Sequence, residues 1–340
     1  MDILRYTAVI VLLASVIAAP CVAQDKSFYI PEIHGTVRAK YEYEPQISAG
    51  RFEVRNARVS VDGKILPVIS YKAEIDLSDE GKIKMLDAYV RFTPEKVTAN
   101  VTMGQMRVPF TIDAHRSPHQ QYFANRSFIA KQVGNVRDVG LAGMYRFGGE
   151  VPLTIEGGIF NGSGLTNQKD YWTKCYNFSA KATASFFRRL VVQASAQRIR
   201  PEDVNIMMWD VGAYYHDHRW HIEAEYLRKN YSHGAFPAVN AVDAFVCRRF
   251  PLKRYLSGIS ALGRYDYMSD HSDGTKDEDG LLSVNDPGRH RLTLGATLHF
   301  GGKKIYADLR VNYEKYFYHQ GITPGISDRD KFVVELMCRF

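Results

Sequence analysis

Residues 331–340 read KFVVELMCRF and alternate between two faces. One face carries the apolar residues Phe332, Val334, Leu336, Cys338 and Phe340. The other face carries the three charged residues of the segment. An edge strand of a soluble sheet would show the same alternation. However, a strand that is apolar on one face and ends the chain also suits a membrane barrel, in which the last strand pairs with the first. We therefore expect residues 329–340 to pair antiparallel with residues near 33–45.

The N-terminal residues 1–23 have the pattern of a secretory signal peptide. Arg5 precedes an apolar run over 8–19, which is too short to span a bilayer comfortably. Small residues at 21–23 predict cleavage after Ala23. The alternatives are lipid attachment at Cys21, against which the preceding proline argues, and an uncleaved anchor. No later apolar stretch of the sequence is long enough for a spanning helix, so insertion in a membrane would require a closed barrel.

The composition is compatible with a barrel and with a large soluble β protein. The 340 residues include 21 Tyr and 18 Phe but are only 45% hydrophobic, as expected where half of each strand is polar and aromatic residues gather at the interfaces. The net charge of +7 fits anionic solutes or lipopolysaccharide, and we expect no nucleic-acid partner for an exported protein. Cys175, Cys247 and Cys338 are widely spaced and odd in number, so no disulfide framework is expected.

Period-two segments divided by turn signals predict about sixteen strands. The predicted ranges are 33–45, 51–63, 66–78, 82–93, 97–107, 137–147, 151–161, 174–187, 189–200, 206–217, 218–229, 241–250, 255–268, 288–300, 302–316 and 329–340. An even number is typical of single-chain bacterial barrels.

The lengths of the connections separate a barrel from a sandwich. Tight turns are predicted after every second strand, near 62–63, 93–95, 148–149, 187–188, 217–218, 251 and 301–302. The intervening connections are longer, notably 108–136, 161–173, 230–240, 269–287 and 317–328, with a short exception near 78–81. This alternation predicts an all-β, single transmembrane antiparallel barrel over 24–340. Its strands would be joined by short turns on the periplasmic side and by long loops on the outer side of the membrane. Residues 24–32 would form a periplasmic lead-in.

Several stretches resemble one known family. They are 55–59 (RNARV), 71–76 (YKAEID), 86–90 (LDAYV), 104–110 (GQMRVPF), 126–127 (RS), 137–140 (RDVG) and 158–162 (GIFNG). Their order and spacing resemble the N-terminal half of the phosphate-selective porin O and P family of Gram-negative outer membranes. The C-terminal half resembles it only in strand pattern and in the terminal Phe340. The final strand also resembles the signal by which the barrel insertion machinery recognises its substrates.

The resemblance implies a homotrimeric, sixteen-stranded, anion-preferring channel without a cofactor. It does not carry over phosphate selectivity, because the family's basic ladder and constriction lysines align with no motif here. Membrane lipid, lipopolysaccharide and small anionic solutes are the expected partners.

The connection 108–136 is long and holds the apolar residues Phe110, Tyr122, Phe123, Phe128 and Ile129. Loops of this length are usually functional or disordered, and the apolar residues favour an ordered loop. We expect it to fold into the lumen and to narrow the wide channel that sixteen strands leave.

The charges of this loop suggest anion attraction. The candidate constriction residues are Asp113, Arg116, Arg126, Lys131 and Arg137, with Lys72, Arg91 and Arg310 on polar faces of the wall. Excess cations in a low-dielectric cleft concentrate anions, and arginine suits oxyanions. Alternatively, some of these arginines pair with carboxylates and hold the loop in place. The direction of Arg107 stays open: its parity is lipid-facing unless a bulge at Gly104 resets it.

Enzyme and metal sites have weak support. His216, His218 and His221 straddle a predicted turn, and the acidic segment 275–286 departs from calcium-loop spacing at both ends. No hydrolase, metalloprotease or phosphate-loop motif is present. The protein is therefore predicted to be an anion-preferring porin, with phosphate as a candidate solute, and not an enzyme. The alternatives are a closed or loop-plugged surface barrel that binds or is structural, and a secreted carbohydrate-binding β protein.

Overall fold

The computed structural model describes residues 29–340 except 80, 133–135, 166–167, 201–203, 273–277, 282 and 303. The expected signal peptide, residues 1–23, lies outside the described residues, as does most of the expected lead-in. In the described part of the chain, no helix is both long and apolar enough to cross a membrane.

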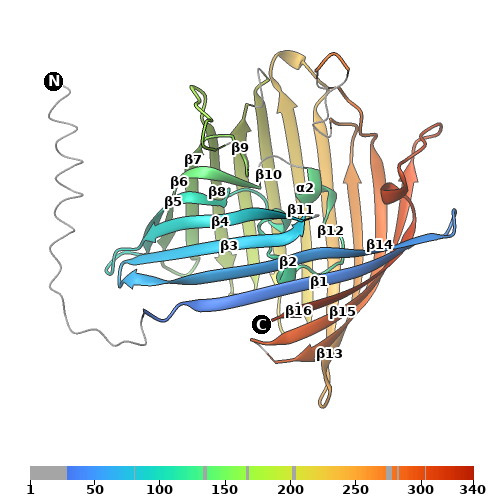
Figure 1. Cartoon of the computed structure of the whole chain (residues 1–340), viewed down its shortest axis with the longest axis horizontal. Helices are drawn as coiled ribbons and strands as arrows, with labels where there is room; N and C mark the ends of the chain where they lie inside the picture. Colours follow the sequence, from blue (N-terminus) through green and yellow to red (C-terminus); the bar gives the residue numbers. More distant parts are fainter. Residues whose placement is uncertain are drawn as a thin grey trace.

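Sixteen strands form one closed antiparallel sheet, in which each strand pairs with its neighbours in the chain and β1 pairs with β16 (Figure 1). Their bounds are β1 Glu32–Glu44, β2 Ala49–Leu66, β3 Ile69–Asp79, β4 Lys82–Phe92, β5 Ala99–Arg107, β6 Arg137–Phe147, β7 Leu153–Phe160, β8 Asn177–Phe186, β9 Leu190–Ile199, β10 Ile206–His216, β11 Trp220–Tyr231, β12 Val239–Pro251, β13 Leu256–Met268, β14 Arg289–Gly301, β15 Tyr306–Tyr318 and β16 Lys331–Arg339. The prediction of an all-β barrel with sixteen strands is confirmed.

The first and last strands close the barrel as predicted. They pair antiparallel from Thr36 opposite Arg339 to Tyr43 opposite Phe332. Next to the Thr36–Arg339 pair, the Gly35 amide donates to the Phe340 carbonyl at 2.7 Å, and the Phe340 amide donates to the Gly35 carbonyl at 3.1 Å. Closure leaves no unpaired sheet edge, which is the condition for strands in lipid.

The two faces of β16 differ as its sequence predicted. Phe332, Val334 and Leu336 are exposed on the outer face, whereas Glu335 and Met337 are fully buried on the inner face. The apolar residues thus face outward, toward the region that lipid would occupy, and the lumen face carries the charged residue.

Connections at one end of the barrel are short, and most of those at the other end are long. The long end carries the connections 108–136, 161–176, 269–288 and 319–330, although β1 and β2 are joined there by residues 45–48 alone, and β4 begins at Lys82 soon after β3 ends at Asp79. One turn was predicted wrongly. Asp62 and Gly63 lie within β2 opposite Lys72 and Tyr71, because the pairing of β2 with β3 continues to Leu66; the turn follows Leu66.

Candidate functional site

The connection 108–136, here called the lumen loop, lies inside the barrel. It contains the short helices η2 (Asp113–His115), η3 (Pro118–Gln120) and α2 (Phe128–Gln132), and α2 packs beside β12 and β13 (Figure 1). Its buried side chains Phe110, Phe128 and Ile129 join a cluster with wall residues such as Met208 and Leu227. Phe123 packs in a second cluster with Phe245, Cys247 and Leu262. The apolar residues of the loop therefore hold it against β10–β13.

Polar wall residues satisfy the backbone of the lumen loop. The amide of Ile112 donates to Glu225 Oε1 at 2.5 Å, and that of Thr111 donates to Ser195 Oγ at 3.1 Å. The amide of Phe128 donates to Asp266 Oδ1 at 3.2 Å. Buried amides need such acceptors wherever regular secondary structure is interrupted. The carboxylates of β11 and β13 thus fix an irregular segment across the lumen.

The side chain of Arg107 points into the barrel and binds the backbone of the lumen loop. Its Nη1 donates to the carbonyls of Ala114, His115 and Arg116 at 3.2, 2.7 and 2.9 Å. The direction that sequence left open follows from Gly104, where φ is +129° and a β-carbon would lie 2.3 Å from the Ala88 carbonyl oxygen. Only glycine adopts this conformation readily, and the in-out alternation is lost just after it: Gln105 and Met106 are both buried, although β5 pairs with β6 there without a register shift.

Arg116 and Asp113 of the lumen loop belong to an ion-pair network. The Nη1 of Arg116 donates to Glu223 Oε1 at 2.8 Å, its Nη2 contacts the other oxygen of Glu223, and Asp113 Oδ1 lies 3.4 Å away. Asp113 also accepts hydrogen bonds from the amide and the hydroxyl of Ser127 at 3.2 and 2.8 Å. Burial opposes ionisation of Asp113, but Arg116, Arg126 and Ser127 keep its pKa below the usual value. These contacts are those of loop anchors.

Arg126 has a different environment. Its carbonyl accepts hydrogen bonds from Arg291 at 2.7 Å and Arg264 at 3.5 Å, which fixes the backbone. Its guanidinium donates to the Arg116 carbonyl at 3.3 Å, and among the described residues it has no carboxylate within ion-pair distance. Burial and the charges of Arg58 and Arg38 lower the pKa of Arg126 to about 10, although Asp113 opposes this. Arg126 therefore stays charged at neutral pH without a direct counter-charge.

The opposite wall, from β2 to β6, carries paired charges. Arg137 bonds to Asp87 at 2.7 Å and Glu74 at 3.3 Å, and Lys72 lies 3.0 and 2.8 Å from the same two carboxylates. Arg58 lies 2.8 Å from Asp76. Two of the predicted wall and constriction cations, Lys72 and Arg137, therefore meet in one network, which Arg58 extends.

A cavity of about 470 Å³ lies on the long-loop side of the lumen loop, and we call it the outer vestibule. Ten cationic side chains line it against two carboxylates. The cations are Arg38, Lys40, Arg51, Arg55, Arg58, Arg126, Lys131, Arg137, Arg291 and Lys331, and the carboxylates are Glu42 and Glu53. Several of the cations pair with carboxylates behind the surface, but the excess of positive side chains facing the cavity favours anions.

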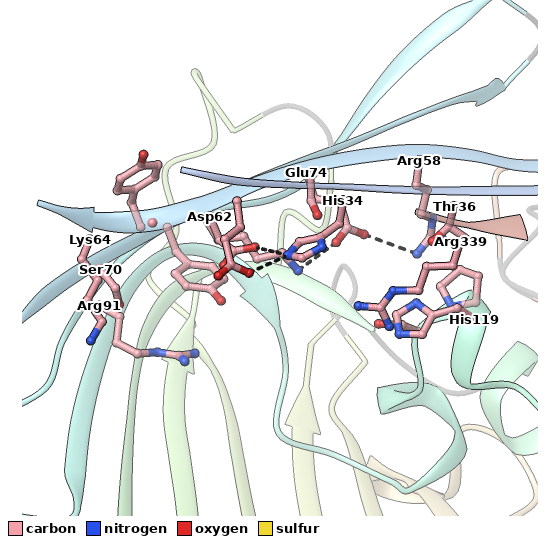
Figure 2. Close-up of a pocket in the computed structure, with 18 of the residues that line it drawn as sticks. His34, Thr36, Arg58, Asp62, Lys64, Ser70, Glu74, Arg91, His119 and Arg339 are labelled. Atoms are coloured by element: carbon pink, nitrogen blue, oxygen red, sulfur yellow. Dashed lines mark hydrogen bonds and ion pairs between the residues drawn. The ribbon is translucent and has the colours of Figure 1, made fainter. Parts of the chain in front are cut away.

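A second cavity of about 540 Å³, the inner vestibule, lies on the short-turn side. Figure 2 shows Arg58, Arg339 and His119 gathered at one end, Lys64 and Arg91 at the other, and His34 beside Asp62 between them. Arg91 bonds to Thr102 Oγ1 at 2.9 Å and has no carboxylate partner among the described residues. Arg58 lines both vestibules, which places it where the two cavities meet.

The remaining predicted cations lie at the two ends. Lys131 lines the outer vestibule, is half exposed, and lies 3.5 Å from Asp328. Arg310 is almost fully buried and bonds to Glu335 at 2.8 Å and Asp308 at 3.4 Å. Sequence reasoning singled out neither Arg58 nor Arg38. Arg58 could have been found, because it belongs to the family-like stretch 55–59 and shares the lumen face with Asn56.

A closed barrel of sixteen strands with a long loop folded into a charged lumen is the architecture of a porin. The family model for phosphate-selective porin O and P matches residues 32–206, which is more than half of the chain. The protein belongs to this family of outer-membrane porins, and the predicted resemblance is confirmed. Its class is a channel, not an enzyme. A comparison with curated protein sequences found no match.

Solved porin structures share the fold at low identity. The outer-membrane channel DcaP of Acinetobacter baumannii is 14% identical over 93% of this chain and 98% of its own, with a TM-score of 0.60. An anion-selective porin from Comamonas acidovorans is 9% identical over 91% and 98%, with a TM-score of 0.61. The trimer form of OmpT from Vibrio cholerae is 11% identical over 92% and 98%, with a TM-score of 0.59.

Proposed function

We propose that this protein is a passive porin that favours small anions, inorganic phosphate among them. The observation that carries the proposal is Arg126, a guanidinium fixed at the lumen loop with cationic neighbours and no carboxylate partner among the described residues. An anion that reaches Arg126 gains two parallel hydrogen-bond donors and relieves repulsion from Arg58 and Arg38.

The proposed path runs from the outer vestibule past Arg126 to Arg58 and then to Arg91 in the inner vestibule. Arg126 and Arg91 offer unpaired charge at either end, whereas Arg58 is shared with Asp76 and Glu74. Because these two carboxylates partly neutralise Arg58, an anion would bind there weakly enough to leave again, as conduction requires. Lys72, Lys131 and Arg137 add to the field along this path.

The remaining assignments follow from this role. We propose residues 1–23 as the export signal and Phe340 with its strand as the insertion signal. The family is described as phosphate-selective, one structural neighbour is an anion-selective porin, and another is a trimer, which supports anion preference and a homotrimer. Lipopolysaccharide and membrane lipid would surround the barrel.

A plugged barrel is the second candidate, because the lumen loop buries several large side chains against β10–β13. In that case the two vestibules would be binding pockets without a continuous water path.

Planar-bilayer recording separates the two candidates. An open porin gives stepwise conductance in chloride, and millimolar phosphate on the outer side lowers the chloride current as phosphate occupies the path. A plugged barrel gives no steps. Steps that phosphate leaves unchanged would support a porin without a phosphate site.

A further inference from the structure

Two arginines lie on the outer surface of the barrel near its long-loop end. Arg198 near the end of β9 and Arg228 near the end of β11 are exposed, whereas their strand neighbours Gln197 and Leu227 are buried in the lumen. Their side chains therefore point away from the channel. Arg198 donates to Asn205 at 3.0 Å and Arg228 to Asn230 at 3.1 Å. Within the described residues, neither has a carboxylate partner.

The register of the sheet brings the two arginines to either side of one strand. Arg198 pairs with Met207 of β10, and Arg228 pairs with Trp209 of the same strand. Two strand spacings, roughly 10 Å, separate them across the sheet, and two residues, roughly 7 Å, separate them along it, so their backbones lie roughly 12 Å apart. Both side chains are long enough to turn toward a group that lies over β10, so they form one cationic surface on the lipid-facing wall.

An apolar groove lies directly beside these arginines, toward the middle of the barrel. Its volume is about 460 Å³, and the side chains that form it on the outer face include Ala182, Ala194, Ala196, Trp209, Val211 and Tyr226. Ala196 is two residues from Arg198 on the same face of β9, and Tyr226 is two residues from Arg228 on β11. Ala180 also lines the groove, so four alanines make the hollow.

We propose that Arg198, Arg228 and this groove bind a phosphorylated, acylated lipid of the outer leaflet. The guanidiniums would hold a phosphate of its headgroup, and the groove would hold an acyl chain. Charge complementarity argues for this occupant: unpaired arginines on a lipid-facing wall are favourable only near the interface, where they meet water or an anionic headgroup. Trp209, on the strand between the two arginines, suits the same depth. The inference uses the outer-membrane setting of the family and is independent of anion selectivity in the lumen.

The test measures binding of purified lipid A to the folded protein in detergent micelles by native mass spectrometry. The probes are bis-phosphorylated lipid A and the same lipid after enzymatic dephosphorylation. The wild-type protein should bind the phosphorylated form, and the double variant R198Q/R228Q should bind it at least about tenfold more weakly, since two charge-assisted contacts are lost. Dephosphorylated lipid should bind the wild type as weakly as phosphorylated lipid binds the double variant.

A matched control is R248Q. Arg248 is also exposed on the outer face but lies near the short-turn end, stacked over Trp220 at 4.9 Å. It should leave lipid A binding unchanged.

Filling the groove with Ala196→Phe should weaken lipid A binding without changing conductance. Heat-modifiable migration on gels checks that each variant folds. Equal binding of both lipids to the wild type, or undiminished binding to the folded double variant, would overturn the proposal. Conductance is read in parallel, so a failed porin assignment would not be mistaken for a failed lipid site.

Discussion

Phe340 lies directly over Gly35 across the seam that closes the barrel. The two residues exchange backbone hydrogen bonds, and a β-carbon added to Gly35 would lie 2.2 Å from Cζ of the Phe340 ring. The aromatic terminus thus packs where the first strand has no side chain. Closure of the barrel therefore depends on the missing side chain at Gly35 as well as on the apolar face of β16.

Gly35→Val should therefore weaken closure, because its side chain must displace the Phe340 ring. We expect a cost of about 1–3 kcal/mol, as for other overpacked contacts. The measurement is the fraction of heat-modifiable, folded protein after refolding into lipid vesicles. Gly143→Val is the control, since a β-carbon there meets no atom closer than 3.9 Å. Equal folding of the two variants would show that the ring contact does not matter.

Breaking the Arg116–Glu223 pair should loosen the lumen loop. Glu223 is fully buried, so Arg116→Ala leaves a buried carboxylate without its arginine and with His221 at 2.9 Å as its remaining side-chain contact among the described residues, at a cost of about 3–5 kcal/mol. We expect noisier single-channel current and a lower denaturant midpoint in vesicles. Lys131→Ala removes the half-exposed pair with Asp328 and should cost less than about 1 kcal/mol. A quiet channel with unchanged stability in Arg116→Ala would contradict its role as an anchor.

His115 should remain neutral far below its ordinary titration range. Burial, and then the charges of Lys181 and Arg107, lower its pKa to about 3, while its Nε2–H donates to the Val108 carbonyl at 2.7 Å. An unfolded His binds a proton near pH 6.5, so loop stability is fully present above that pH. It falls between pH 6.5 and 3, by at most about 1.4 kcal/mol per pH unit.

NMR of ring-labelled histidine measures this directly, with His115→Gln used for assignment. The His115 resonance should stay fixed from pH 8 to pH 4. Titration near pH 6 would mean that the imidazole is open to solvent and that the loop is not packed as described.

Arg126 should set the sensitivity to phosphate. Arg126→Gln removes the unpaired charge and should weaken phosphate block of the chloride current by about tenfold, the value of one charge-assisted contact. Arg126→Lys keeps the charge but loses the two parallel N–H donors of the guanidinium. Phosphate should block this variant less strongly than the wild type and more strongly than the glutamine variant. Lys131→Gln serves as a peripheral control with little effect. A glutamine variant that phosphate blocks as well as it blocks the wild type would place the anion elsewhere.

Local patterns predicted most of the barrel, because period-two alternation and loop length report directly on strands and on the two ends. The failures have long-range causes. Arg107 turns inward through an unusual backbone conformation at Gly104, which parity cannot reveal. The partner of Arg116 lies 107 residues away, so pairing with a carboxylate could be suspected from the sequence but not assigned to Glu223. Asp62-Gly63 has the composition of a turn, yet its pairing with Lys72 and Tyr71 keeps it in β2.

The central claim is that the lumen favours anions, and the reversal potential of the wild-type channel tests it most directly. Purified protein in a planar bilayer is placed under a tenfold potassium chloride gradient, and the voltage of zero current is recorded. The account predicts a reversal potential with the sign of chloride selectivity that shrinks as salt screens the lumen charges. A reversal potential with the sign of potassium selectivity would contradict it.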